Sequence, residues 1–211
     1  MVEANSPTPD EVSEFMSSDR RAALIENTAR YLEMHPDPHH ADFLRSFAGR
    51  VFEELGYLWC RKRLGHKQRL LDPDETLAYF LDLYGGLPSQ TLLQGGVFNE
   101  YLPDGIILPG EGNPLASDAV VVEYTASSPN ARLSKYIHHK EEMVRTLRKR
   151  FPPIFGHGKL QIIFTVDSYP TVKNTKNVDA RTSLFAAPHS HGNVYSLTQT
   201  LIEQHFPHIR P

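Results

Sequence analysis

Two acidic residues, Asp104 and Glu123, are the strongest candidates for chemistry in this chain of 211 residues. Asp104 follows a proline in the segment YLPDGIIL, and Glu123 interrupts the apolar run AVVVEYT. A carboxylate within such an apolar run is costly to bury unless it is paired or binds a cation. Two carboxylates from neighbouring strands, together with a backbone carbonyl, suit a hard cation such as Mg²⁺ or Mn²⁺. The alternative is that Asp104 caps a turn and Glu123 pairs with a basic residue.

The hydrophobic pattern predicts the elements that must position these two acids. In chain order we expect short helices within 9–34, helices over 42–64 and 74–84, strands over 97–101, 105–108 and 119–125, a helix over 129–150, a strand over 160–166 and a helix over 193–205. The segment 168–192 is expected to be a loop with one weak strand near 183–185. This order predicts an α/β fold with a mixed central sheet flanked by helices.

The motifs of the central region follow one another in a familiar order. A helix containing GRVFEELGY precedes a strand that begins after PDG, a strand containing Glu-x-Thr, a basic helix and a further strand. Between residues 43 and 167 this order resembles the PD-(D/E)xK nuclease superfamily, whose restriction endonuclease-like core is α-β-β-β-α-β. The resemblance implies that Asp104 and Glu123 form a metal site with a glutamate of the first helix. It also implies a lysine two residues after the strand acid, where this chain has Thr125.

Thr125 departs from the family pattern because it has no charge with which to activate a water or offset developing charge. Either the site has lost its activity or the lysine comes from elsewhere. The following helix offers Lys140, which falls within the buried stripe of Ile137 and Val144. Some members of the superfamily supply the lysine from this helix, so the resemblance permits Lys140 to take the catalytic role. The alternative is that Lys140 runs along the edge of the core with its ammonium in solvent.

The helix glutamate is either Glu53 or Glu54. The family-like spacing from Gly49 selects Glu53, whereas the apolar stripe of Phe47 and Val51 selects Glu54. A second face of small residues would let the helix approach a sheet closely, which favours Glu53. That face contains Gly49, Glu53, Gly56 and Cys60. Two solvated glutamates are the remaining alternative.

The helix expected within 128–150 is locally basic. It carries seven basic and two acidic residues, in a chain whose formal net charge is -3. Basic surface on an acidic protein suits contacts with phosphates, and we expect it to bind nucleic acid. The candidate residues are Arg132, Arg145, Arg148 and Lys149. The alternative is a solvated, charge-rich helix face.

Composition and length limit the class of protein. The single cysteine, Cys60, excludes a disulfide within the chain and a zinc site built on cysteines. The longest apolar run is too short to span a bilayer, and the polar N-terminus does not resemble a signal peptide, so we expect a cytoplasmic protein with no membrane partner. We expect a tail and helical extension over 1–40, and a nuclease-like α/β domain over 41–211 with a helical insertion over about 66–96.

Together these features predict Mg²⁺- or Mn²⁺-dependent hydrolysis of phosphodiester bonds in nucleic acid, with DNA as the favoured substrate. Asp104, Glu123 and the Tyr124 carbonyl are expected to hold the metal. Glu53 is expected to bind metal or position water, and Lys140 to assist the nucleophile. The alternative function is a catalytically inactive module on the same fold that binds nucleic acid or protein. The sequence leaves the oligomeric state open, with a homodimer as one option.

Overall fold

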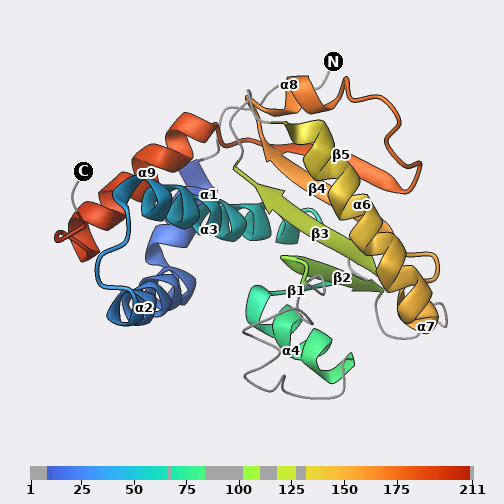
Figure 1. The fold of residues 1–211 in the computed structure, drawn as a ribbon, viewed down its shortest axis with the longest axis horizontal. Coiled ribbons are helices and arrows are strands. Elements are labelled where there is room, and N and C mark those ends of the chain that lie inside the picture. Colours follow the sequence, from blue (N-terminus) through green and yellow to red (C-terminus); the bar gives the residue numbers. More distant parts are fainter. Residues whose placement is uncertain (1–8, 66–67, 84–101, 110–117, 127–131, 210–211) are drawn as a thin grey trace.

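A mixed five-stranded sheet forms the centre of the chain in a computed structural model that describes residues 9–65, 68–83, 102–109, 118–126 and 132–209 (Figure 1). Its strands are β1 (Gln68–Leu71), β2 (Gly105–Pro109), β3 (Val120–Thr125), β4 (Lys159–Thr165) and β5 (Thr182–Ala187). The strands lie in this order across the sheet. The β1–β2 and β2–β3 pairs are antiparallel, whereas β3–β4 and β4–β5 are parallel. The predicted α/β class with a mixed sheet is therefore confirmed.

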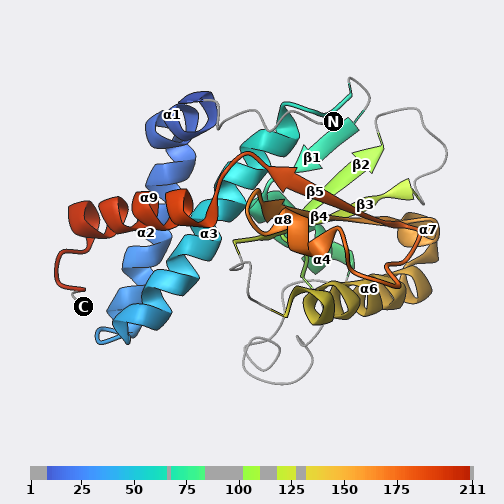
Figure 2. The same ribbon diagram turned by 90° about the horizontal axis from the view of Figure 1, so that it is seen from above.

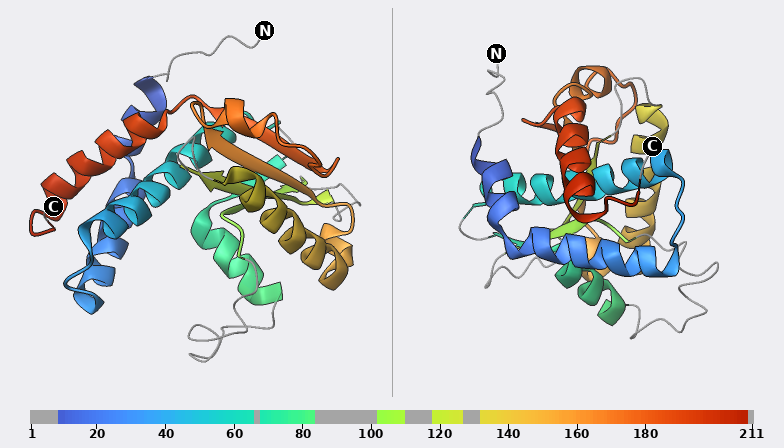
Figure 3. Two further views of the ribbon diagram at one scale, coloured as in Figure 1. Left: turned by 45° about the horizontal axis from the view of Figure 1, so that its top comes forward. Right: turned by 90° about the vertical axis from the view of Figure 1, so that its left-hand side faces the viewer.

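Helices cover the sheet on both sides. They are α1 (Pro9–Ser17), α2 (Asp19–Met34), α3 (His40–Arg61), α4 (Pro73–Leu83), α6 (Leu133–Arg150), α7 (Pro152–Phe155), α8 (Tyr169–Val172) and α9 (His191–His205). The long helix α6 lies along the sheet, whereas α1, α2 and α9 gather around α3 at the other side (Figures 1 and 2). Figure 3 shows α9 lying across α3 from a third direction. Among the described helices, none combines the length and the apolar character needed to cross a membrane.

Strand β3 is buried on both faces, and its alternation decides which way Glu123 points. Val122 and Tyr124 belong to the core that α3 covers, whereas Val121 belongs to the core that contains Ile137 of α6. Because successive side chains of a strand point to opposite faces, Glu123 lies on the α6 face with Val121. The alternation of the strand thus places the Glu123 carboxylate in the layer between the sheet and α6.

Helix α3 approaches β3 closely at a glycine. A Cβ atom at Gly56 would overlap the ring of Tyr124, so only glycine allows this separation. The predicted face of small residues is used here, although a Cβ at Gly49 would meet no neighbour. The close contact brings the middle of α3, with its two glutamates, near the end of β3 where Glu123 lies.

Several elements differ from the expected ones. Strand β1 was not expected, because its four residues QRLL carry too short a pattern to separate a strand from a loop. The expected strand 97–101 lies outside the described residues. The expected loop 168–192 contains α8 and the full strand β5, and the helix expected from 129 is seen from Leu133 onward. Because β1 pairs with β2, part of the expected insertion 66–96 belongs to the central sheet.

Candidate active site

Glu123 and Lys140 meet in the layer between the sheet and α6. The Lys140 Nζ lies 2.5 Å from Glu123 Oε2, and the Glu123 side chain is fully buried, whereas that of Lys140 is 18% exposed. The placement follows from two periodicities. Alternation turns Glu123 towards α6, and the helical stripe that buries Ile137 and Val144 turns Lys140 towards the sheet. The closeness expected from the helical phase of Lys140 is therefore present, and a catalytic role for it stays a prediction.

Asp104 lies across from Glu123 at the start of β2. Gly105 pairs with Val122 in the antiparallel β2–β3 ladder, which places the preceding residue, Asp104, opposite Glu123. Asp104 Oδ2 accepts a hydrogen bond of 2.8 Å from the Tyr124 N–H. Because the N–H and C=O of one residue point to the same side of an extended strand, the Tyr124 carbonyl also lies on the Asp104 side of β3. Asp104 and Glu123 therefore lie side by side at the β2–β3 pair, and their joint role as metal ligands with the Tyr124 carbonyl stays a prediction.

Burial and negative charge raise the pKa of Asp104 to about 8. Loss of hydration is the main cause, and the charge of Glu123 adds to it. The Tyr124 N–H and the Lys140 ammonium act in the opposite direction. The pKa of the Asp104 carboxyl therefore lies well above the ordinary aspartate range, chiefly because the group is buried and secondarily because Glu123 is negatively charged.

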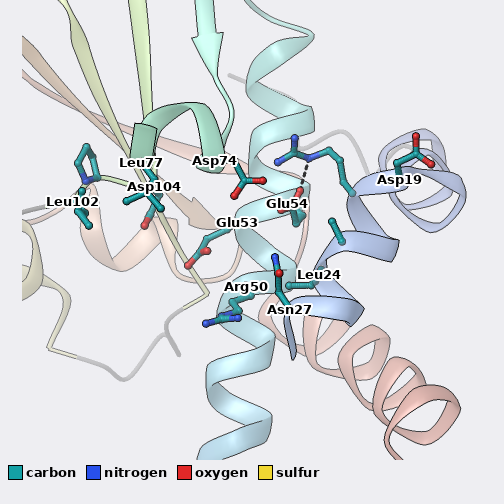
Figure 4. A pocket seen from close by; sticks show the side chains of 13 residues that line it. Asp19, Leu24, Asn27, Arg50, Glu53, Glu54, Asp74, Leu77, Leu102 and Asp104 are labelled. Carbon is teal, nitrogen blue, oxygen red and sulfur yellow. Dashed lines mark hydrogen bonds and ion pairs between the residues drawn. The ribbon is translucent and has the colours of Figure 1, made fainter. Parts of the chain in front are cut away.

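Glu53 is the glutamate of α3 that faces this site. Burial raises its pKa to about 8, the charge of Asp104 adds to that rise, and Arg50 and Lys140 oppose it. In Figure 4 the Glu53 and Asp104 side chains point towards each other from opposite walls of a pocket. Glu53, Asp104, Glu123 and Lys140, hereafter the acidic centre, are thus coupled electrostatically.

Glu54 points away from the acidic centre and belongs to a set of contacts that joins α2, α3 and the start of α4. Its Oε2 accepts a hydrogen bond of 2.5 Å from Arg20 Nε on α2. Arg20 also lies 3.5 Å from Asp72, just before α4, and its guanidinium stacks 4.1 Å from the centre of the Tyr57 ring. The structure therefore separates the two glutamates that the sequence left open: Glu53 faces Asp104, and Glu54 holds α2 against α3.

The two glutamates should respond differently to removal of their charge. We expect Glu54→Gln to lower the free energy of unfolding by about 1 kcal/mol through the weakened Arg20 contact, with metal-dependent cleavage unchanged. Glu53→Gln should instead lower cleavage by about tenfold or more without loss of stability, if its carboxylate has the role in hydrolysis that the sequence predicts. Urea unfolding and a cleavage assay on both proteins test this pair. The reverse pattern would assign the site to Glu54.

Tyr136 belongs to the site and was missed by the sequence analysis. Its hydroxyl lies 3.4 Å from Glu123 Oε2, and its ring centre lies 5.5 Å from Lys140 Nζ. Burial and the charge of Glu123 raise the pKa of the phenol well above its ordinary value, so the hydroxyl stays protonated and donates to Glu123. The signal was its position one helical turn before Lys140, which places both side chains on one face of α6.

We expect Tyr136→Phe to lower cleavage modestly. The change removes one hydrogen bond to Glu123 and keeps the ring beside Lys140, so turnover should fall about three- to tenfold and the free energy of unfolding by about 1 kcal/mol. Tyr195→Phe on α9 is the matched control and should leave both unchanged. Steady-state cleavage rates and denaturant unfolding check these values, and parent-level turnover in Tyr136→Phe would remove the hydroxyl from the site.

The acidic centre has the charge balance of a divalent cation site. Its three carboxylates exceed its one ammonium by two charges when all are ionised, and burial together with this negative charge raises the pKa of Glu53 and of Asp104 to about 8. In the described part of the chain, no three His, Cys, Asp or Glu side chains are already grouped as a metal site. The Lys140 ammonium pairs with one carboxylate oxygen of Glu123, and the Tyr124 N–H donates a hydrogen bond to one carboxylate oxygen of Asp104. The donors fit Mg²⁺ or Mn²⁺ chemically, as hard oxygens.

Two of the four arginine and lysine residues expected to bind nucleic acid also have ion-pair partners within the protein. Arg148 is 14% exposed, donates 2.9 Å to the Gly158 carbonyl and lies 3.8 Å from Asp179. Arg145 binds Glu142 at 2.8 Å. The contacts of Arg148 hold the end of α6 against Gly158, just before β4, and against Asp179, between α8 and β5, whereas the Arg145–Glu142 pair lies within the helix. Arg132 and Lys149 are exposed, as a phosphate-binding role requires.

No protein-family model, curated protein or solved structure matches the chain. The geometry of the acidic centre and the order of the elements around it are therefore what point to a function.

Proposed function

We propose that the chain is a Mg²⁺- or Mn²⁺-dependent nuclease of the PD-(D/E)xK type whose lysine comes from α6. The observation that carries this proposal is the Lys140 ammonium on the buried Glu123 carboxylate, beside Asp104. The element order supports it, because α3, β1, β2, β3, α6 and β4 follow one another as α-β-β-β-α-β, with α4 inserted after β1. In this arrangement β1 takes the first strand position, which the sequence analysis had assigned to 97–101.

Each residue of the acidic centre then has a distinct role. Asp104, Glu123 and the Tyr124 carbonyl would hold the cation. The bound cation supplies Lewis acidity towards a water molecule and a phosphate oxygen. Glu53, whose pKa of about 8 lies near neutral pH, can exchange a proton with water in the pocket. Lys140 supplies the positive charge that Thr125 lacks, and its ammonium can donate hydrogen bonds to a phosphate oxygen.

A cleavage assay tests the proposal. The parent chain is incubated with circular single-stranded DNA, circular duplex DNA and RNA, in Mg²⁺, in Mn²⁺ and in EDTA. We expect metal-dependent cleavage of at least one of these, with DNA favoured, and its loss in Glu123→Gln. If the parent cleaves none of them in either metal, the nuclease proposal fails, and binding without cleavage would favour an inactive binding module on this fold.

A further inference from the structure

A pocket of about 640 Å³ opens beside the acidic centre, and its lining includes Glu53 and Asp104 but not Lys140. It lies between α2, α3, α4 and the segment 102–104, and Glu53 and Asp104 form part of its wall (Figure 4). Leu77 and Leu102 are 43% and 36% exposed, among the most exposed large apolar side chains of the described residues. The pocket thus has two residues of the acidic centre, Glu53 and Asp104, in its wall and two exposed leucines, Leu77 and Leu102, in its lining.

The charges of the pocket limit what it can hold. Five carboxylates and two guanidiniums line it. Arg20 is engaged by Glu54 and Asp72, whereas no hydrogen bond or ion pair within the described residues engages Arg50, which is exposed beneath Glu53 (Figure 4). One available guanidinium can bind one phosphate, and the surrounding carboxylates repel a second.

The rest of the lining suits an uncharged group. Leu24, Leu77 and Leu102 offer apolar contact, and the Asn27 amide, which Figure 4 shows reaching towards the middle of the pocket, offers both donors and an acceptor. A sugar and base have this mixture of apolar faces and polar edges. Pockets of roughly 300–1,000 Å³ are typical for ligands of that size. A paired duplex, whose major groove alone is about 12 Å wide, does not fit such a pocket.

We propose that this pocket holds one nucleotide of a single strand beside the cleaved bond, with its phosphate on Arg50 and its sugar and base against Asn27 and the leucines. This inference rests on the proposed nuclease function and narrows its substrate to single-stranded or unpaired nucleic acid. It also places the substrate path over α2 and α3, whereas the sequence analysis had placed it over the basic helix within 128–150, whose Arg145 and Arg148 have ion-pair partners within the protein.

Two variants with matched controls test the pocket. Ala23 lines the pocket from the exposed face of α2, so Ala23→Trp fills it without changing charge, and its neighbour Ala22, also exposed but outside the lining, gives the control Ala22→Trp. Arg50→Met removes the proposed phosphate ligand. Arg45, exposed on the same helix and paired with Asp42, gives the control Arg45→Met. The probe is a fluorescent 12-nucleotide single strand, or its blunt duplex, titrated in EDTA and followed by anisotropy at several salt concentrations.

We expect tighter binding of the single strand than of the duplex. Ala23→Trp and Arg50→Met should each weaken single-strand binding by about tenfold, and Arg50→Met should also reduce the salt slope by about 0.7, the value for one phosphate contact of a single strand. Both controls should bind like the parent. Parent-level binding in either pocket variant, or equal affinity for duplex and single strand, would overturn the proposal.

The nuclease proposal and the pocket proposal fail separately. A parent that cleaves DNA while the pocket variants bind and cleave like the parent leaves the acidic centre in place and removes the pocket from the substrate path. If the parent cleaves nothing but binds the single strand, and both pocket variants lose that binding, the pocket proposal stands and the nuclease proposal fails.

Discussion

Replacing Lys140 by alanine is expected to reduce metal-dependent cleavage by roughly 10²-fold or more, with the loss in turnover. In the proposed mechanism the ammonium acts on charge that develops as the phosphodiester bond breaks, so substrate affinity should change little. The variant should still fold, because Lys140 is at the edge of the α6 stripe and Glu123 can take a proton once its partner is lost. Steady-state kinetics at saturating substrate, with circular dichroism as the folding check, measure both effects.

The control for Lys140 is Lys135→Ala, on the exposed face of the same helix, which should cleave like the parent. A second protein carries Thr125→Lys together with Lys140→Ala and should recover part of the activity. Position 125 is on the same face of β3 as Glu123, so a lysine there points into the same layer. A Lys140→Ala protein that turns over as fast as the parent would exclude Lys140 from the mechanism.

Asp104→Asn should abolish cleavage while stabilising the metal-free protein at alkaline pH. We expect cleavage to fall by about 10³-fold, because one of the proposed cation ligands is lost. The pKa of Asp104 is raised from an ordinary 3.8 to about 8, so the folded chain keeps a proton that the unfolded chain releases. The stabilisation of the folded chain by this proton is fully present below about pH 4, and it is lost as the pH rises through about 8. Asparagine keeps the acceptor for the Tyr124 N–H without the buried charge.

Thermal unfolding from pH 4 to pH 9 measures this effect. At pH 8 without metal, Asp104→Asn should be more stable than the parent by about 2 kcal/mol, and the difference should vanish near pH 4. Adding 10 mM Mg²⁺ at pH 8, a concentration of roughly the magnitude used for weak oxygen-ligand sites, should stabilise the parent alone. An Asp104→Asn protein that is less stable than the parent at pH 8 would show that the carboxylate is a structural ligand of β3.

Much of the acidic centre could be predicted from the sequence because two of its parts rest on strict periodicity. Strand alternation placed the Glu123 side chain on the other face of the sheet from Val122 and Tyr124. The helical stripe through Ile137 and Val144 placed Lys140 against the face to which Glu123 points. The mixed sheet followed from the order of the strong elements. These features depend on local patterns that tertiary packing preserves.

Other parts depended on contacts that no local pattern encodes. Glu53 and Glu54 differ by one position, and the choice between them was made by Arg20 on α2, 34 residues earlier, which binds Glu54. Strand β1 is too short for its pattern to be read without its partner β2. Arg148 was expected to face nucleic acid, and its partners, the Gly158 carbonyl and Asp179, come from segments brought beneath α6 by the fold.

The most direct test of the acidic centre is a crystal structure of the parent chain soaked in Mn²⁺, with anomalous scattering to place the ion. We expect one Mn²⁺ peak within about 2.4 Å of carboxylate oxygens of both Asp104 and Glu123, with the Lys140 ammonium displaced from Glu123. A map with no Mn²⁺ at these carboxylates, and with Lys140 still paired to Glu123, would contradict the assignment of this centre as a metal-dependent nuclease site.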